Sequence, residues 1–302
     1  MNKSFTLIEI LVVIVIVGIL SAFIIVSMSG VSQKATIAKG QAFSSSLKNA
    51  LMTNLVSEWK FDELSTATAG ATISDSWSTN NGTLVSNDAN DKLRTGSECI
   101  SGKCLYFDGT DDYINYGSPS SLTITKFLTI EAWIKQTIDA QAGQYIVGND
   151  RDGGTPVGGY DIHTRSNRLF YGCIWRKSTG TRACASGSSV PENSWHYVVS
   201  TFDGQNLKVY QNGIRSGTAS IVDEIENPSQ NFTIGCLAYG RPVYYKFYGT
   251  MDNIRIYDAA ISVSRVQQNY YSGLNRLLKN GGITIKEYTQ RNSQLADTIV
   301  KN

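Results

Sequence analysis

The stretch Leu128-Thr-Ile-Glu-Ala-Trp-Ile134 decides the fold, because its composition and length are those of a β-strand. Most of its residues are β-branched or aromatic, which suits a pleated and half-buried surface. Runs of the same kind recur on both sides of it, and turn dipeptides such as Asp108-Gly109, Asp203-Gly204 and Asn212-Gly213 separate several of them. The other predicted strands are 56–61, 113–116, 145–147, 160–163, 169–175, 195–202, 207–210, 232–235 and 244–257. About ten short strands with this spacing predict an antiparallel β-sandwich.

Six blocks of sequence in this part of the chain follow one another in a recognisable order. They are Trp59-Lys-Phe-Asp62-Glu63, Gly102–Gly109 with Asp112-Tyr113, Thr129–Ile134, Trp195–Val198, Val209–Gly213 and Gly249–Tyr257. Together they resemble laminin-G-like domains of the concanavalin A-like fold, over residues 56–262. The resemblance implies a two-sheet jelly roll, which that family uses for glycan or protein binding and sometimes as a plain scaffold.

An apolar run, Phe5–Met28, precedes the predicted sandwich. It is long enough to cross a bilayer, which takes about 20 apolar residues. Glu9 lies inside this run, and a charge in hydrocarbon is costly unless it finds a partner, so Glu9 indicates assembly rather than simple anchoring. Apolar residues keep a helical spacing beyond the run, which predicts one long helix over 5–55, transmembrane over about 5–28.

The segment Lys3-Ser-Phe-Thr-Leu-Ile-Glu9 resembles the N-terminal signal of type IV pilins and pseudopilins. In that family a short basic leader is cut before a Phe, the new N-terminus is methylated, and Glu is fifth in the mature chain. The resemblance implies a leader at 1–4, cleavage between Ser4 and Phe5 by a prepilin peptidase, and Glu9 as an assembly residue. The family usually has Gly where this chain has Ser4.

This second resemblance implies a precursor in the cytoplasmic membrane with its C-terminus outside, and then an extracellular pilus built with other copies or other pilins. Adhesion to a surface glycan or protein would suit the jelly roll. Two rival functions remain: a pseudopilin of a type II secretion or DNA-uptake machine, and a membrane-anchored glycan-binding protein without a fibre. A plain anchor and a cleaved secretory signal peptide are further alternatives for the apolar run.

The last part of the chain, 263–302, returns to a helical spacing of apolar residues that Gly281-Gly282 interrupts. We expect this tail to pack over a sheet edge or over the junction with the long helix. The whole chain is therefore predicted to be mainly β, with a helix before the sandwich and a helical tail after it.

Composition argues against two classes of function. The net charge is +2 and no basic cluster is present, so we expect no nucleic-acid partner. Glucanases of this fold carry carboxylates that alternate along one strand. Glu131 has no carboxylate two or four residues away, and the two histidines, His163 and His196, have no nucleophile context. We therefore expect no enzyme.

Five cysteines in an exported domain indicate disulfides, with one thiol left over. Cys99 and Cys104 enclose four residues that include a Gly, as in a short bridged turn. Cys173 and Cys184 flank a polar, Gly-containing stretch, as the arms of a hairpin would. Cys236 then remains alone. The alternative is that all five are reduced.

The laminin-G-like resemblance also implies a structural calcium ion between the first and last strands. Asp252 is its best candidate ligand, with Asp62 or Asp108 helping. The alternative is that these residues cap turns or accept backbone hydrogen bonds. Asp150-Arg-Asp152-Gly-Gly lacks the spacing of a twelve-residue calcium loop and is expected to be a surface turn.

Glycan binding would need exposed aromatic rings on which sugar faces stack. Those in or near predicted loops are Trp77, Trp175, Tyr239, Tyr244 and Tyr245. Trp59 and Trp133 alternate with apolar neighbours in strands, so they are expected in the core.

Overall fold

The computed structural model describes residues 54–137, 143–150, 157–227, 231–237 and 245–301. The chain divides into two units, 1–53 and 54–302, and the description below concerns the second. The pilin-like N-terminus, with Ser4, Phe5 and Glu9, lies outside the described residues. No helix within the described ranges is long and apolar enough to cross a membrane.

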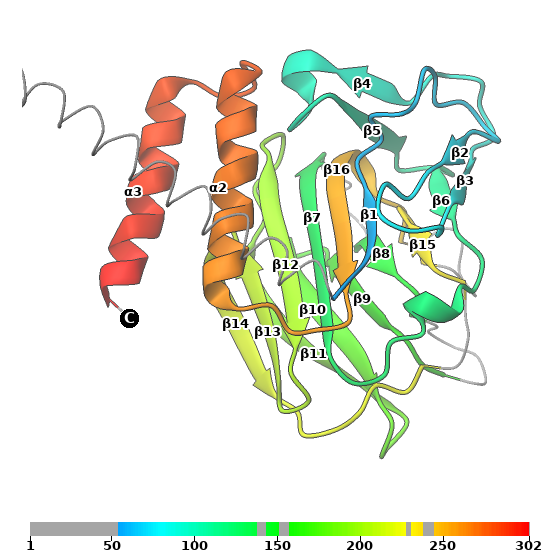
Figure 1. Cartoon of the computed structure of the whole chain (residues 1–302), viewed down its shortest axis with the longest axis vertical. Helices are drawn as coiled ribbons and strands as arrows, with labels where there is room; N and C mark the ends of the chain where they lie inside the picture. The colour runs from blue at the N-terminus through cyan, green and yellow to red at the C-terminus, as the bar shows by residue number, and fades with distance from the viewer. Residues whose placement is uncertain (1–53, 138–142, 151–156, 228–230, 238–244, 302) are drawn as a thin grey trace, which may run out of the picture. The chain divides into compact units, whose positions relative to one another are not determined.

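Two eight-stranded antiparallel sheets stack face to face, which confirms the predicted sandwich (Figure 1). Both sheets contain strands that the sequence predicted. Short 3-10 turns lie at Gly96–Glu98 and Ser120–Leu122. Sheet A has the order β14 (Ile214–Ser220), β13 (Asn206–Gln211), β12 (His196–Phe202), β7 (Leu128–Gln136), β16 (Tyr248–Tyr257), β5 (Lys103–Asp108) and β4 (Leu93–Thr95), and β1 (Leu55–Trp59) also pairs with β16. Sheet B has the order β11 (Thr181–Ser189), β10 (Leu169–Arg176), β9 (Tyr160–Thr164), β8 (Gln144–Gly148), β15 (Thr233–Ile234), β6 (Tyr113–Asn115), β3 (Gly82–Val85) and β2 (Thr72–Ile73).

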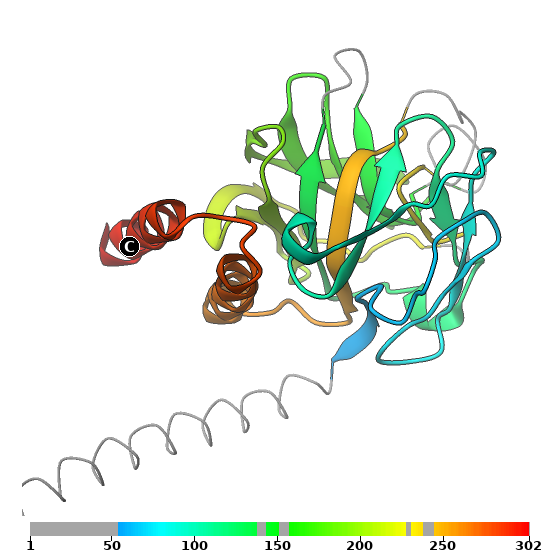
Figure 2. The ribbon, with the colours of Figure 1, turned by 90° about the horizontal axis from the view of Figure 1, so that it is seen from above.

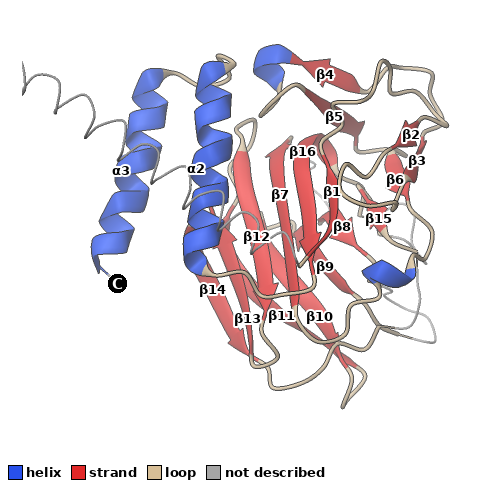
Figure 3. Ribbon diagram, viewed as in Figure 1, coloured by secondary structure: helices blue, strands red, loops and turns tan. Residues whose placement is uncertain are grey.

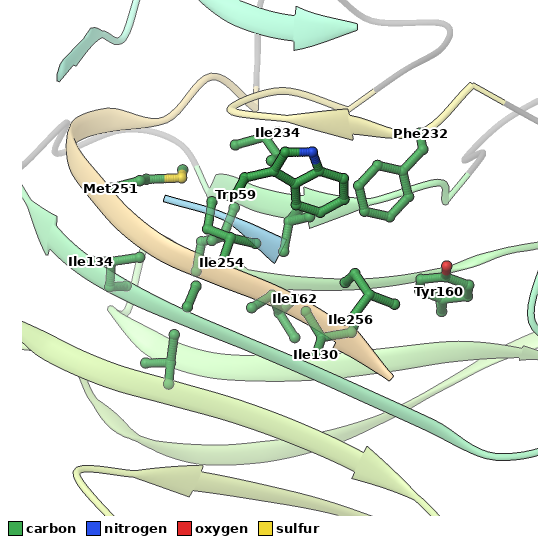
Figure 4. Packing of buried hydrophobic residues seen from close by; sticks show 14 of the residues in the cluster. Trp59, Ile130, Ile134, Tyr160, Ile162, Phe232, Ile234, Met251, Ile254 and Ile256 are labelled. Atoms are coloured by element: carbon green, nitrogen blue, oxygen red, sulfur yellow. The ribbon is translucent and has the colours of Figure 1, made fainter. Parts of the chain in front are cut away.

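The main hydrophobic core fills the space between the two sheets (Figure 4). Trp59 is fully buried there and stacks on Phe232, with ring centroids 5.5 Å apart. Its indole N–H donates to the backbone oxygen of Asn80 at 3.0 Å, so burial leaves no polar group of the ring unpaired. The prediction that Trp59 is a core residue is confirmed.

A second hydrophobic cluster lies on the outer face of sheet A, beneath helix α2 (Val263–Lys279). The Ser262 side chain caps this helix by accepting from Arg265 N–H. Trp133 is buried in this cluster and stacks on Tyr270 at 5.7 Å between centroids. A Cβ on Gly273 would lie 2.3 Å from the Trp133 ring, so the close approach of α2 requires glycine there.

The tail therefore covers a face of sheet A and not a sheet edge, and the other expected place, the junction with the long helix, lies outside the described residues. Helix α3 (Ile285–Lys301) follows the Gly281-Gly282 break and lies beside α2 (Figures 2 and 3). It contributes Leu295 to the second cluster. The physical reason is that the outer face of sheet A is itself apolar, so it needs a cover as the inner face does.

Strand β16 contains a β-bulge at Asn253, whose φ is +49°. The bulge restarts the alternation of side chains along the strand. Met251 faces the sandwich core before it, and Ile254 and Ile256 face the same core after it. Arg255 consequently lies on the outer face, where α2 covers the sheet.

Candidate functional site

A pocket of about 340 Å³ opens on the outer face of sheet B, at the end formed by β8 to β11. Its volume is at the lower end of the range for small-molecule sites, about 300–1,000 Å³. The described residues that line it are mostly polar or aromatic: Gly143, Tyr145, Asp150, His163, Arg165, Ser166, Arg182, Leu237 and Tyr245.

Strand alternation places the polar residues of the pocket on one face. Tyr160 and Ile162 of β9 point into the sandwich core, so Asp161 and His163 point away from it. Across the sheet, His163 is opposite Tyr171 of β10, and the two rings stack with centroids 5.3 Å apart.

Arg182 of β11 joins two buried carboxylates beneath the pocket. Its Nη2 lies 2.9 Å from Asp150 Oδ2 and 2.5 Å from Asp161 Oδ1. The carboxyl group of Asp150 also accepts the indole N–H of Trp175. Both aspartates are 1% exposed, so these contacts form in a region from which water is largely excluded.

We expected Asp150 in a surface turn, but the residue is buried. Residues 151–156 of that stretch lie outside the described part of the chain. Burial, reinforced by the negative charge of Asp161, raises the pKa of the Asp150 carboxyl to about 8. Burial alone would also raise the pKa of Asp161, but Arg182 outweighs it and holds that pKa below its usual range. At neutral pH the first carboxyl is mostly protonated and the second is ionised.

Arg165 differs from Arg182 because its side chain is exposed at the rim of the pocket. Its guanidinium carbon lies 4.4 Å from the centroid of the Tyr171 ring, a cation–π arrangement. Its Nε donates to His163 Nε2 at 3.5 Å, and His163 Nδ1 lies 2.5 Å from Asp161. This pattern assigns the ring hydrogen of His163 to Nδ1. Among the described residues, no carboxylate forms an ion pair with Arg165.

Both predicted disulfides are confirmed, and they close the loops that the spacing indicated. Cys99–Cys104 closes the turn before β5, and Cys173–Cys184 joins directly opposed residues of β10 and β11. Cys236 is free and buried, and burial raises the pKa of its thiol to about 11. Since Cys173 is bridged, its proximity to Asp161 and His163 does not make a metal site.

The calcium candidates Asp252 and Asp62 both contact the Cys99–Cys104 loop. Asp252 is completely buried, and its Oδ2 accepts the N–H groups of Ile100 and Ser101 at 2.9 and 3.2 Å. Asp62 Oδ1 accepts the N–H of Lys103 at 2.8 Å. Both residues thus accept backbone hydrogen bonds, as the alternative interpretation held.

The region around Asp252 and Asp62 holds several side-chain oxygen atoms and little positive charge. Burial, together with the charge of Asp62, holds the pKa of the Asp252 carboxyl well above its usual range. Asn253 Oδ1 is buried and has no hydrogen-bond partner among the described residues. Hard oxygen donors without a cation suit calcium, so these residues fit the ion that the resemblance implies.

Asp108 does not belong to that group. It pairs with Tyr248 of β16, four residues before Asp252, which corresponds to roughly 13 Å along a strand. Its carboxylate instead lies 3.3 Å from the ammonium of Lys92, which also contacts Asp88 at 2.8 Å and Asp112 at 2.9 Å. The Lys92 side chain supplies positive charge there.

The structure places two of the predicted aromatic candidates at the pocket. Trp175 is half-buried and bonded to Asp150, and Tyr245, a further candidate, lines the pocket itself. Trp77 is 39% exposed but follows β2, at the opposite end of sheet B. Tyr239 and Tyr244 lie outside the described residues.

Sequence reasoning missed Asp161, Arg165 and Arg182. A signal was present for the first, because Tyr160-Asp-Ile-His163 alternates and must place Asp161 and His163 on one face. The two arginines gave no such signal, since their place depends on which strands become neighbours.

Comparisons with known proteins agree with this fold. The binding domain of Paraclostridial Mosquitocidal Protein 1 is 17% identical, with a TM-score of 0.53 over 74% of this chain and 53% of that one. The botulinum neurotoxin serotype D ligand-binding domain, solved with N-acetylneuraminic acid, is 12% identical, with a TM-score of 0.55 over 75% and 52%. At such identities the likeness shows the fold alone, and it spans about half of each structure. No curated protein matches the sequence.

Two family models match this chain. Residues 1–25 match the prokaryotic N-terminal methylation motif, as the pilin-like segment implied, and this motif is typical of membrane-anchored precursors. Residues 108–267, more than half of the chain, match the concanavalin A-like lectin/glucanase superfamily. The chain therefore belongs to the concanavalin A-like lectin/glucanase superfamily and carries a prokaryotic N-terminal methylation motif.

Proposed function

We propose that this protein is a structural subunit of a type IV pilin-like filament, which displays its sandwich outside the cell to bind a ligand. The observation that supports the proposal most is the methylation motif at residues 1–25, in a chain whose sandwich begins only 30 residues later, at Leu55. The length of chain before the sandwich, from residue 5 onward, suits a helix that first anchors the subunit and then bundles with others.

Assembly rests on the pairing of two charges. After cleavage between Ser4 and Phe5, the α-amino group of Phe5 is a cation beside the bilayer. Glu9 of a neighbouring subunit is the natural partner, because pairing removes the cost of a lone carboxylate in hydrocarbon. The partners are therefore other pilin subunits and the prepilin peptidase that makes the cut.

The test compares Glu9→Ala with Glu98→Ala, an exposed glutamate of the sandwich. We expect Glu9→Ala to reach the membrane normally but to be missing from fibres sheared off the cell surface, whereas Glu98→Ala appears in both fractions. N-terminal sequencing of the protein in fibres should begin at Phe5. Equal amounts of the two variants in sheared fibres would contradict the proposal.

The same experiment separates the rival functions. A pseudopilin or a membrane-anchored glycan-binding protein would leave no wild-type chain in the sheared fraction. Mature protein that still begins at Met1 would favour a plain anchor.

We propose no catalytic activity for the pocket. In support, Asp150 is the one carboxylate among the described lining residues, whereas glycoside hydrolysis uses a pair. We also propose a structural calcium ion held by Asp252, Asp62 and Asn253. Bound calcium would supply the positive charge that the buried carboxylate lacks and would fix the Cys99–Cys104 loop against β16.

A further inference from the structure

We propose that the pocket on sheet B binds a saccharide that carries a carboxylate, and that Arg165 receives this carboxylate. The proposal rests on the ligand-displaying function proposed above and names the ligand class of the same site. Three features carry it: the balance of charge around the pocket, the position of Arg165, and the chemistry of the remaining lining residues.

The first feature is that positive charge is in excess at the pocket. Arg182 is already matched by Asp161 at 2.5 Å, and Asp150 lies 2.9 Å from it. Arg165 has no carboxylate partner among the described residues. The guanidinium of Arg165 therefore leaves a positive charge at the rim of the pocket that no described carboxylate pairs. Such a site favours a ligand with a negative charge.

The second feature is that Arg165 is held in place at the rim and is still accessible. The face of its guanidinium lies on Tyr171, and its Nε donates to His163. These contacts do not use the two terminal nitrogens of Arg165. Those nitrogens form the edge of a guanidinium that binds a carboxylate in a bidentate manner. Arg182 differs because its charge is already matched within the protein, where its Nη2 binds the two buried aspartates.

The third feature distinguishes a sugar from an acidic peptide. The lining residues that a ligand can reach include the half-buried ring of Tyr245 and the exposed Ser166 hydroxyl, whereas Tyr145 and Asp150 are buried behind them. An aromatic ring packs against the C–H face of a pyranose, and a hydroxyl group exchanges hydrogen bonds with sugar hydroxyls. Leu237 is the one aliphatic lining residue in the described part of the pocket, so little is offered to the apolar side chains of a peptide.

The test uses two disaccharides that differ only at one carbon: cellobiouronic acid, with a carboxylate, and cellobiose, with a hydroxymethyl group. Binding of each to the full chain in detergent is measured by calorimetry. The variants are Arg165→Gln and Arg168→Gln. Arg168 is the matched control, because it lies in the same β9–β10 turn, is exposed, pairs with Glu192 at 2.9 Å and does not line the pocket.

We expect the wild-type chain to bind cellobiouronic acid at least about tenfold more tightly than cellobiose, which is the usual size of a charge-assisted hydrogen-bond contribution. Arg165→Gln should remove this preference and Arg168→Gln should keep it. Added salt should weaken binding of the acid alone.

Three results would overturn the proposal: equal binding of the two disaccharides, an equal effect of the two substitutions, or tighter binding of tri-glutamate than of cellobiouronic acid. The last result would identify an acidic peptide as the ligand. Fibre assembly is measured separately by shearing, so failure of saccharide binding would leave the filament function standing.

Discussion

Glu131 of β7 and Arg255 of β16 form a 2.7 Å ion pair between sheet A and α2. Glu131 is fully buried, and Asn269 of α2 donates to its Oε2 at 2.9 Å. Arg255 also binds Glu58 of β1, with Nε 2.6 Å from Oε1. One pair thus connects the first strand, two central strands and the covering helix, and it explains why a carboxylate occurs in an otherwise apolar strand.

Replacement of Glu131 by Gln should lower the free energy of unfolding by up to about 3–5 kcal/mol, because it removes one partner of a buried ion pair and leaves Arg255 with Glu58 as its remaining carboxylate. Urea unfolding of the full chain in detergent measures the loss. Glu98→Gln, at an exposed position, should change stability by no more than about 0.5 kcal/mol. A loss below about 1 kcal/mol for Glu131→Gln would show that the pair is not important for stability.

Removal of the Cys173–Cys184 disulfide by a double substitution to Ser should cost about 3 kcal/mol, from the closure of a loop of 11 residues. The Cys99–Cys104 bridge closes a shorter loop of 5 residues, so its removal should cost about 2 kcal/mol. Denaturant titrations of the two double variants give both values. The reverse order would mean that native-state contacts, and not loop length, govern their contributions.

Stability should fall as the pH drops from about 6.5 to about 4, because of His196. Its Nε2 lies 2.9 Å from Ser194 Oγ, and Asn212 Nδ2 lies 3.1 Å from its Nδ1. Burial, with the nearby charge of Arg291, lowers the pKa of His196 to about 4. In this window the unfolded chain takes up a proton that the folded chain refuses, so up to about 3 kcal/mol is lost.

Thermal or urea unfolding at several pH values measures this loss, and His196→Gln is the control. An amide can both donate and accept but does not titrate, so the variant should lose less stability than the wild type between pH 6.5 and 4. Parallel curves for the two proteins would assign the acid sensitivity to other groups.

Binding of cellobiouronic acid should weaken several-fold as the pH rises from 7 to 9. The pKa of Asp150 is raised to about 8, so in this range it gains a negative charge that repels the ligand carboxylate. The groups that face it are Arg182, Asp161, Tyr145 and Trp175. Asp150→Asn should flatten the pH profile. A steep profile in that variant would mean that another group titrates.

Calcium should raise the melting temperature of the full chain by about 5–10 °C at a concentration of 100 times the dissociation constant, compared with chelator. Asp252→Asn should abolish the shift, because it removes the central ligand. Asp108→Asn is the matched control and should keep it, since that carboxylate is bound to Lys92. No shift in the wild type would remove calcium from the proposal and leave the backbone hydrogen bonds of Asp252 as its role.

The sequence predicted most of what apolar pattern and short-range spacing determine. Strands such as β7 and β12 were found because nearly all of their residues are buried, and the disulfides because each closes a short loop. Strands β11 and β14 were not found as strands. Each forms one edge of its sheet, is rich in Ser, Gly and Thr, and buries little of its surface, so it carries no apolar alternation.

The candidate site was harder to predict than the fold for a related reason. The burial of Asp150 depends on Arg182 and Trp175, which come from two other strands and are 25 or more residues away in sequence. A short polar stretch with two glycines is typical of a surface turn, and nothing local distinguishes it from one that tertiary contacts cover.

The bulge at Asn253 has a consequence for how this protein can change over evolution or in engineering. The extra residue sets which face each following side chain of β16 occupies, so substitutions there alter one contact at a time. Deletion of a single residue would instead exchange the faces of Ile254, Arg255, Ile256 and Tyr257 together, turning the guanidinium into the core and two isoleucines out of it. Strand β16 is therefore expected to tolerate single substitutions better than the insertion or deletion of a residue.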